Sequence, residues 1–387
     1  MRAVGQVRRL VAILGVFLAA GSSESRAEAP HHPVNFSFFY PLSISSDPMV
    51  STNFRLNLLY GRVGAIRGVD LSGVVARVHG EVRGLQLTGA VSVTGGEVRG
   101  LAVTGGFGYV AGDGRGLQAS GLISYAHGAW RGVQYASLFN YAEQEIVGAQ
   151  VSTVYNLANA DVRYVQFASI VNAVSGSLRG IQASGGINYV QEQVTGIQAG
   201  LFDYARRFHG AQVGLLNWTD TAHGAQIGLV NIAKGSGDFA LGLVNVAPNG
   251  GADWVTFASS YAAINTGVRT SLRGFYSMLT LGSIDLVAER EDTAFLTWNY
   301  GYAFGIARRW QLDTDLGFVH VVPGSGDDPA ENDRLHFALQ ARALGELRLG
   351  DRTTIFGGAG MSTVFSEYST DATTEIEPLV VLGISMY

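Results

Sequence analysis

The chain has 387 residues, 52 glycines, no cysteine and a formal net charge of −5. The lack of cysteine excludes disulfides, thiolate metal sites and a lipoprotein acylation site, and the near balance of charges gives no basic surface for nucleic acid. Charged residues make up only 15%, below the roughly 25% of soluble domains. This composition leaves an all-β membrane protein as an option.

The first 27 residues are predicted to be a signal peptide. Arg2, Arg8 and Arg9 precede the apolar run 10–20, and Ser25-Arg26-Ala27 offers small residues for cleavage. Residues 28–49 form an N-terminal segment with a first strand around Phe36. No later apolar run reaches about 18 residues, so no transmembrane helix is expected.

Residues 50–250 contain a repeat of sixteen and later fourteen residues, with twelve units from Gly68. We call the glycine that begins each unit the opening glycine. The opening glycines are Gly68, Gly84, Gly100, Gly116, Gly132, Gly148, Gly180, Gly196, Gly210 and Gly224, and Tyr164 and Asp238 occupy the two other opening positions. Repeats of this kind indicate one supersecondary unit used many times.

Amides and arginines recur at fixed places in the repeat. A glutamine stands two residues after the opening glycine at Gln86, Gln118, Gln134, Gln150, Gln166, Gln182, Gln198, Gln212 and Gln226. An asparagine follows later in the unit at Asn140, Asn156, Asn172, Asn188, Asn217, Asn231 and Asn245, with Asp203 in the equivalent place. An arginine directly precedes the opening residue at Arg67, Arg83, Arg99, Arg115, Arg131, Arg163 and Arg179.

Side chains alternate within each unit, which indicates β-strands with one apolar face and one amide-bearing face. Strands of about ten residues and one clear turn signal per unit favour a single antiparallel up-and-down barrel of the outer-membrane type, with roughly 20–22 strands. In that barrel the turn centres on Glu145, Asn140 pairs with Gln150, and the arginines alternate between two rims. The alternative is a parallel β-solenoid over about 50–250, followed by C-terminal antiparallel strands or a small barrel.

Residues 251–387 continue the β pattern without the repeat. Four segments read as strands, namely TAFLTWNYGYAFGIARRW, LHFALQARALGELRLG, TTIFGGAGMSTVF and PLVVLGISMY. Residues 323–334 form an acidic loop that must be exposed to solvent. The final strand ends on Tyr387, which resembles the signal that the outer-membrane barrel-assembly machinery recognises.

The units GAQVGLLN (210–217) and GAQIGLVN (224–231) and the segment LGLVNVAPNG (241–250) resemble a bacterial family of surface-repeat proteins with G-x-Q-x-x-G-L-x-N units. The segment from Asn53 also resembles that family's entry segment. The resemblance covers most of residues 50–280 and implies export to the outer membrane or cell surface. It implies no biochemical activity, and the missing cysteine departs from the relatives that look like lipoproteins.

These observations predict a non-enzymatic barrel that acts as a passive channel or scaffold. The amides would line a neutral lumen for small polar solutes or fix strand register by bonding to one another, and Arg83, Arg99, Arg115, Arg131, Arg163 and Arg179 would form a solvated rim. A surface solenoid without a pore is the alternative, and an outer-membrane enzyme the third hypothesis. We predict outer-membrane lipid as a partner, and no cofactor, metal or catalytic residue, although His209 and His223 occupy equivalent positions in neighbouring units.

Overall fold

The fold was analysed in a computed structural model, which describes residues 30–260, 262–285, 294–322, 336–367 and 372–386. These residues form β-strands, turns and loops, and none of them is helical. The chain divides into two compact units, Met1–Arg206 and Arg207–Tyr387. The signal peptide, the acidic loop 323–334 and Tyr387 lie outside the described residues.

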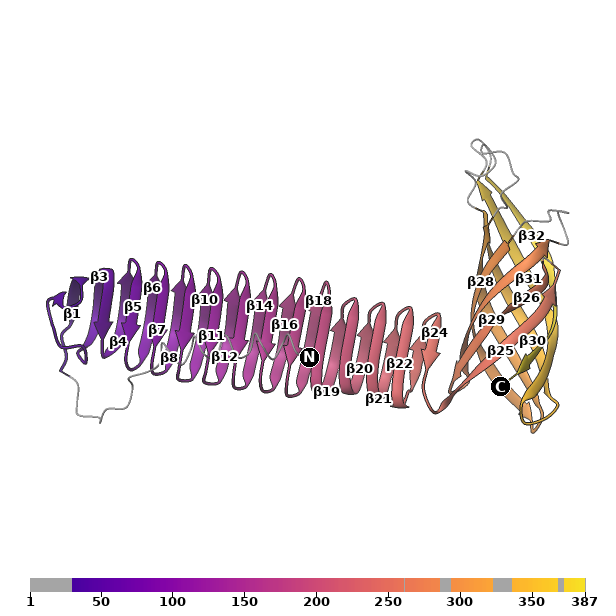
Figure 1. Cartoon of the computed structure of the whole chain (residues 1–387), viewed down its shortest axis with the longest axis horizontal. Helices are drawn as coiled ribbons and strands as arrows, with labels where there is room; N and C mark the ends of the chain where they lie inside the picture. Colours follow the sequence, from indigo (N-terminus) through magenta and orange to yellow (C-terminus); the bar gives the residue numbers. More distant parts are fainter. Residues whose placement is uncertain (1–29, 261, 286–293, 323–335, 368–371, 387) are drawn as a thin grey trace. The chain divides into compact units, whose positions relative to one another are not determined.

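Unit 1 is a parallel β-solenoid in which each sixteen-residue coil holds two strands. In one coil these are β12 (Trp130–Ala136) and β13 (Phe139–Ala142), and the next coil has β14 (Ile146–Ser152) and β15 (Tyr155–Ala158). β12 pairs with β14 in parallel, and β13 pairs with β15 in parallel. Successive coils therefore stack side by side (Figure 1).

The predicted single barrel of 20–22 strands is wrong, and the alternative architecture is confirmed. Gln134 pairs with Gln150 and Asn140 with Asn156, always one coil apart. The antiparallel pairing of Asn140 with Gln150 is absent, because the chain turns twice within each sixteen-residue unit. The second turn, at Ser137 and Leu138, lies between β12 and β13.

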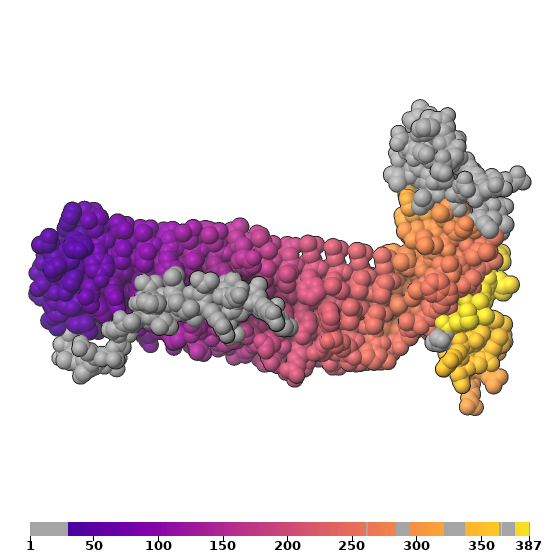
Figure 2. Space-filling model, in the orientation of Figure 1, coloured from indigo at the N-terminus to yellow at the C-terminus, as the bar shows by residue number. Residues whose placement is uncertain are grey.

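Long strands and short strands form the two faces of the solenoid, and its surface repeats from coil to coil (Figure 2). The other long strands are β4 (Ala65–Ser72), β6 (Val82–Thr88), β8 (Val98–Thr104), β10 (Gly114–Ser120), β16 (Val162–Ala168) and β18 (Leu178–Ser184). The other short strands are β5 (Val75–Val78), β7 (Val91–Thr94), β9 (Phe107–Val110), β11 (Ile123–Ala126) and β17 (Val171–Val174). In β19 (Ile187–Ala199) a short strand and the following long strand are continuous, and β20 (Phe202–Val213) has the same form.

The first coil is covered by an N-terminal segment. β1 (Val34–Phe39) pairs in parallel with β3 (Ser51–Val63), and β2 (Leu42–Ser43) pairs with β1 in the antiparallel direction. The strand predicted around Phe36 is thus present. This segment covers the N-terminal edge of the sheet, which would otherwise present unpaired backbone groups.

The opening glycines are required by backbone geometry. Gly132 has φ 129°, and a Cβ placed on it would lie 2.2 Å from the carbonyl oxygen of Gly116 in the preceding coil. Only glycine combines this positive φ with so close an approach at low cost. Tyr164 holds the same place with φ 98°, so one coil carries a strained non-glycine residue.

We expect Gly132→Ala to lower the free energy of unfolding by about 2–3 kcal/mol, because it adds positive-φ strain and a steric clash. Tyr164→Gly is the matched change in the opposite direction and should raise the free energy of unfolding by about 1 kcal/mol. Urea unfolding followed by circular dichroism measures both. A Gly132→Ala chain as stable as the parent would contradict this account of the repeat.

Unit 2 begins with further coils of the same kind and then changes to an antiparallel barrel. Its coils contain β21 (Leu216–Ile227), β22 (Val230–Ser236), β23 (Phe239–Leu241) and β24 (Val244–Val246). The barrel strands are β25 (Gly250–Ser259), β26 (Ala262–Leu272), β27 (Phe275–Asp285), β28 (Ala294–Ala307), β29 (Trp310–Val322), β30 (His336–Arg348), β31 (Thr353–Glu367) and β32 (Ala372–Met386). Each pairs with the next, and β32 pairs with β25, so the eight strands close. The barrel strands include all four C-terminal segments that the sequence predicts to be strands.

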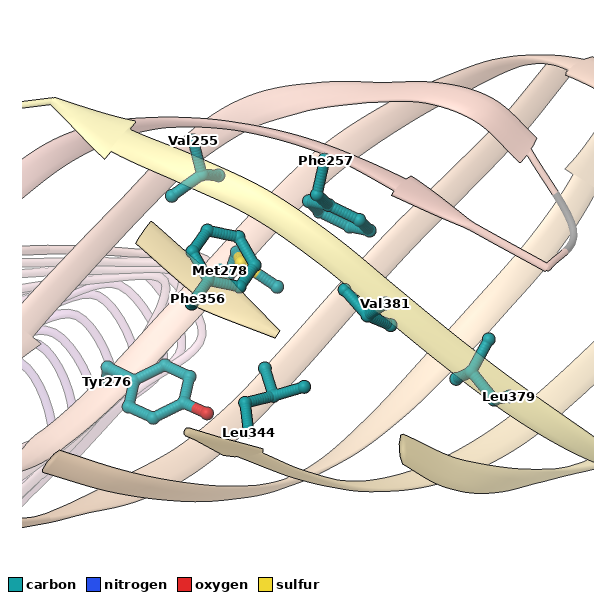
Figure 3. Close-up of a cluster of buried hydrophobic side chains, with 8 residues drawn as sticks. All are labelled: Val255, Phe257, Tyr276, Met278, Leu344, Phe356, Leu379 and Val381. Atoms are coloured by element: carbon teal, nitrogen blue, oxygen red, sulfur yellow. The ribbon is translucent and has the colours of Figure 1, made fainter. Parts of the chain in front are cut away.

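Side chains fill the interior of the barrel. Val255, Tyr276, Phe356 and Leu379 belong to a buried apolar cluster (Figure 3). The outward side chains are apolar as well, and Leu316 and Leu382 are 71% and 70% exposed. The barrel thus has an apolar exterior in addition to a packed interior.

Candidate functional site

The predicted glutamines form a hydrogen-bonded ladder inside the solenoid. Gln134 Nε2 donates to Gln118 Oε1 at 3.1 Å, and Gln150 Nε2 donates to Gln134 Oε1 at 2.8 Å. Gln166, Gln182 and Gln198 continue the series with bonds of 2.7–2.8 Å, and Gln226 donates to Gln212 at 2.9 Å in unit 2. Each glutamine donates to the preceding coil, and all are buried.

The asparagines form a second ladder, in which the side-chain amides donate toward the following coil instead of the preceding one. Asn140 Nδ2 donates to Asn156 Oδ1 at 2.9 Å, and Asn172 Nδ2 donates to Asn188 Oδ1 at 3.0 Å. Asn156 donates to Asn172, and in unit 2 Asn217, Asn231 and Asn245 form a series with bonds of 2.8 Å. These amides are buried inside coils, so the predicted placement in a barrel lumen is wrong, whereas bonding between neighbouring strands is present.

The glutamine ladder is interrupted at Ala102, which stands between Gln86 and Gln118, so Gln118 donates to the backbone oxygens of Gly108 and Tyr125. On the other side of this interruption, Gln86 contacts a buried ion pair. Gln86 Nε2 donates to Asp70 Oδ2 at 3.1 Å, and Asp70 accepts two further bonds from Arg55 at 2.6 and 2.7 Å. Arg55 neutralises this carboxylate, and both side chains are at most 1% exposed.

The asparagine ladder of unit 1 ends in a carboxylate. Asn188 Nδ2 donates to Asp203 Oδ1 at 2.7 Å, while Asp203 Oδ2 has no partner among the described residues. Asp203 is fully buried, and this burial raises its pKa from 3.8 to about 6, against the smaller opposing effect of the hydrogen bonds from Asn188 and Gly200. The two buried carboxylates thus differ, because Asp70 has a counterion within the structure and no arginine or lysine forms an ion pair with Asp203 in the described coils.

Asp203→Asn is expected to stabilise the solenoid at neutral pH. Because the folded pKa is raised, the parent chain is most stable below about pH 4 and loses stability as the pH rises toward about 6. Each pKa unit corresponds to about 1.4 kcal/mol, so the ionised carboxylate costs about 3 kcal/mol above pH 6. Urea unfolding between pH 4 and pH 7 should show this slope in the parent chain and a smaller one in Asp203→Asn. An unchanged slope would assign the pH dependence to another group.

The predicted rim arginines form one column instead of alternating between two rims. Arg83, Arg99, Arg115 and Arg131 are in register, as are Arg163 and Arg179. Stacked like charges destabilise a sheet, and acidic neighbours offset them through ion pairs. These pairs are Arg67–Glu81, Arg83–Glu81, Arg99–Glu97 and Arg163–Glu145, at 2.6–3.1 Å. The arginines are half exposed, so each pair contributes at most about 1 kcal/mol.

Tyrosines and histidines form shorter columns, and the tyrosines belong to a buried apolar cluster on the short strands. The rings of Tyr109, Tyr125 and Tyr141 lie 5.0 and 4.9 Å apart, and Tyr125 donates to Glu143, which also contacts His127. The rings of His209 and His223 lie 5.3 Å apart. Among the described residues, no three His, Asp or Glu side chains converge on a point where a metal could bind.

The barrel interior holds a charged network that the sequence analysis missed. Arg269 contacts Asp313 at 2.7 Å and Glu346 at 3.1 Å, and Arg342 donates two bonds to Asp315 at 2.8 and 2.9 Å. Tyr276 also donates to Asp315 at 2.7 Å. The alternation of these charges with apolar residues along each strand was the available signal. One cavity among the barrel side chains, lined by residues that include Asn265 and Gln340, has a volume of about 20 Å³, room for about one water molecule.

The geometry defines the class of protein as a parallel β-solenoid with a closed eight-stranded antiparallel barrel at its C-terminal end. No protein-family model, curated protein or solved structure matches the chain. In the described part of the chain, no helix is long and apolar enough to span a membrane.

Proposed function

We propose that this chain is a non-enzymatic surface protein of the bacterial outer membrane, in which the barrel is the anchor and the solenoid is an interaction surface. The observation that carries this proposal is the inverted barrel, with charges inside and large apolar side chains outside. Water-soluble proteins rarely expose an apolar band of this kind, whereas membrane barrels require one. The predicted export signal and the resemblance to the surface-repeat family support the same location.

A passive channel fits the geometry less well. The buried network around Arg269 and Arg342 fills the barrel, and the amides expected to line a pore bond to one another inside the solenoid. We therefore propose that the amides have a structural role and that the exterior of the coils contacts the partner.

The anchor can be tested with the mature chain refolded in detergent and added to lipid vesicles. We expect it to float with the vesicles, to resist alkaline extraction and to migrate faster on a detergent gel before heating. Leu316→Arg with Leu382→Arg should abolish this behaviour, because each arginine costs about 2–4 kcal/mol near the bilayer centre. Gln144→Arg, on an exposed turn of the solenoid, is the control.

A mature chain that stays soluble without detergent and does not float would overturn the anchor. Steady conductance in planar bilayers would restore the channel hypothesis.

A further inference from the structure

The connections between the barrel strands differ in length at the two ends of the barrel. β25 begins where the last coil of the solenoid ends, and each later strand reverses direction, so the connections fall alternately at one end and the other. At the end where β25 begins, every connection is short, and these connections are 273–274, 308–309 and 349–352. The opposite end has the two longest connections, and its set is 260–261, 286–293, 323–335 and 368–371. We call these the short-connection end and the long-connection end.

The last coil of the solenoid is fastened to the short-connection end. The backbone N–H of Asn245 donates to Thr270 Oγ1 at 3.2 Å, close to the connection 273–274. Asp238, at the opening position of this coil, forms an ion pair at 2.8 Å with Arg273 in the same connection. The coils of unit 2 thus meet the barrel at the end where its connections are short.

Both ends of the barrel segment lie at the short-connection end. β25 begins there and β32 ends there, and the pairing of Trp254 with Met386 brings the two ends together. This is a consequence of the even number of strands, which is also the rule for bacterial membrane barrels. In those barrels the short turns face the periplasm and the longer loops face the exterior of the cell.

The length of chain that would have to cross the membrane favours the same orientation. An exported chain reaches the outer membrane from its periplasmic side. With the long-connection end outward, only the connections between strands cross, and the longest of these is 323–335. In the opposite orientation residues 30–249 would cross as well, although unpaired backbone groups are strongly unfavourable in hydrocarbon.

The described side chains fill the barrel interior and leave no room for a polypeptide to pass. Arg269 lies between Asp313 and Glu346, at 2.7 and 3.1 Å, and Arg342 donates two bonds to Asp315. An eight-stranded barrel has an interior just wide enough for its own side chains. A solenoid outside the cell could therefore not have reached its place through this barrel.

We propose that the solenoid lies in the periplasm, with the short-connection end of the barrel facing inward and the long-connection end facing the exterior of the cell. This inference rests on the proposed outer-membrane anchor and identifies the side of the membrane on which the interaction surface lies. The partner of the coils is then a periplasmic molecule. The connections 286–293 and 323–335 are the parts of the chain that meet the exterior.

The chain has no cysteine, so single-cysteine variants can report the side of the membrane. The full chain is produced in Gram-negative cells, and a membrane-impermeant maleimide is added before or after the outer membrane is permeabilised. Gln144→Cys and Lys234→Cys place the thiol on exposed positions of the coils. Gly350→Cys marks the short-connection end, where an added Cβ has no neighbour within 4 Å, and Ser325→Cys marks the connection 323–335.

We expect Ser325→Cys to be labelled equally before and after permeabilisation. Labelling of Gln144→Cys, Lys234→Cys and Gly350→Cys should increase several-fold when the membrane is opened. Heat-modifiable migration of each variant on a detergent gel verifies that its barrel is folded.

Full labelling of Gln144→Cys in intact cells would overturn the proposal and place the coils outside, while a heat-modifiable barrel in the same cells would leave the anchor intact. Protection of all four positions in intact cells would reject the anchor itself, and the inference with it, because the whole chain would then lie in the periplasm.

Discussion

Replacing Arg55 with methionine is expected to lower the free energy of unfolding of the N-terminal coils by about 3–5 kcal/mol, because it leaves Asp70 as a buried, unpaired charge. Arg55 donates two hydrogen bonds to Asp70 and one to Ser72, and neither member of the ion pair contacts solvent. Removing one partner of such a pair costs far more than the pair contributes. The effect should be local, because coils of a solenoid interact mainly with their neighbours.

The double change Arg55→Met with Asp70→Asn tests the cause. Asparagine removes the charge but keeps an oxygen that accepts from Gln86, so most of the lost stability should return. Hydrogen exchange of the amides in β4 and β6 measures both variants. Arg67→Met, at an exposed ion pair with Glu81, is the control and should cost less than about 1 kcal/mol. A double variant as unstable as Arg55→Met would show that packing, not charge, explains the loss.

The existence of the strands could be predicted from sequence, but their direction could not. Alternation around Gln134 and Gln150 shows which side chains share a face, and this is equally true of parallel and antiparallel neighbours. The deciding feature is the second turn of the coil. It has glycine at Gly89, Gly105 and Gly121 but Ser137 and Thr153 in later coils, so it carries no uniform turn signal.

The site could be predicted in part. Burial of Gln150 and Asn156 follows from their position on one face, and the structure adds that the two ladders donate in opposite directions. That direction explains why a carboxylate stands at Asp203, where the asparagine ladder of unit 1 ends, and it depends on contacts between coils that spacing alone does not reveal. The ion pairs of the barrel interior were missed for a related reason, since Arg269 and Glu346 are 77 residues apart.

Gln150→Leu is expected to lower the free energy of unfolding by about 2–6 kcal/mol. Leucine fills a similar volume but removes both ladder bonds, so Gln134 Oε1 loses a donor and Gln166 Nε2 loses an acceptor. Each buried polar atom left without a partner costs about 1–3 kcal/mol. Urea unfolding should therefore show a lower midpoint, and hydrogen exchange should increase in β12, β14 and β16.

Gln226→Leu is the matched control for this prediction. Gln226 is also buried but has one ladder bond, to Gln212, because Ala240 follows it in the next coil. Replacing Gln226 should lower the free energy of unfolding by about half as much as replacing Gln150. Equal losses at the two positions would mean that the cost comes from filling the interior with leucine. A larger loss at Gln150 would show that stability depends on an unbroken series of donors and acceptors.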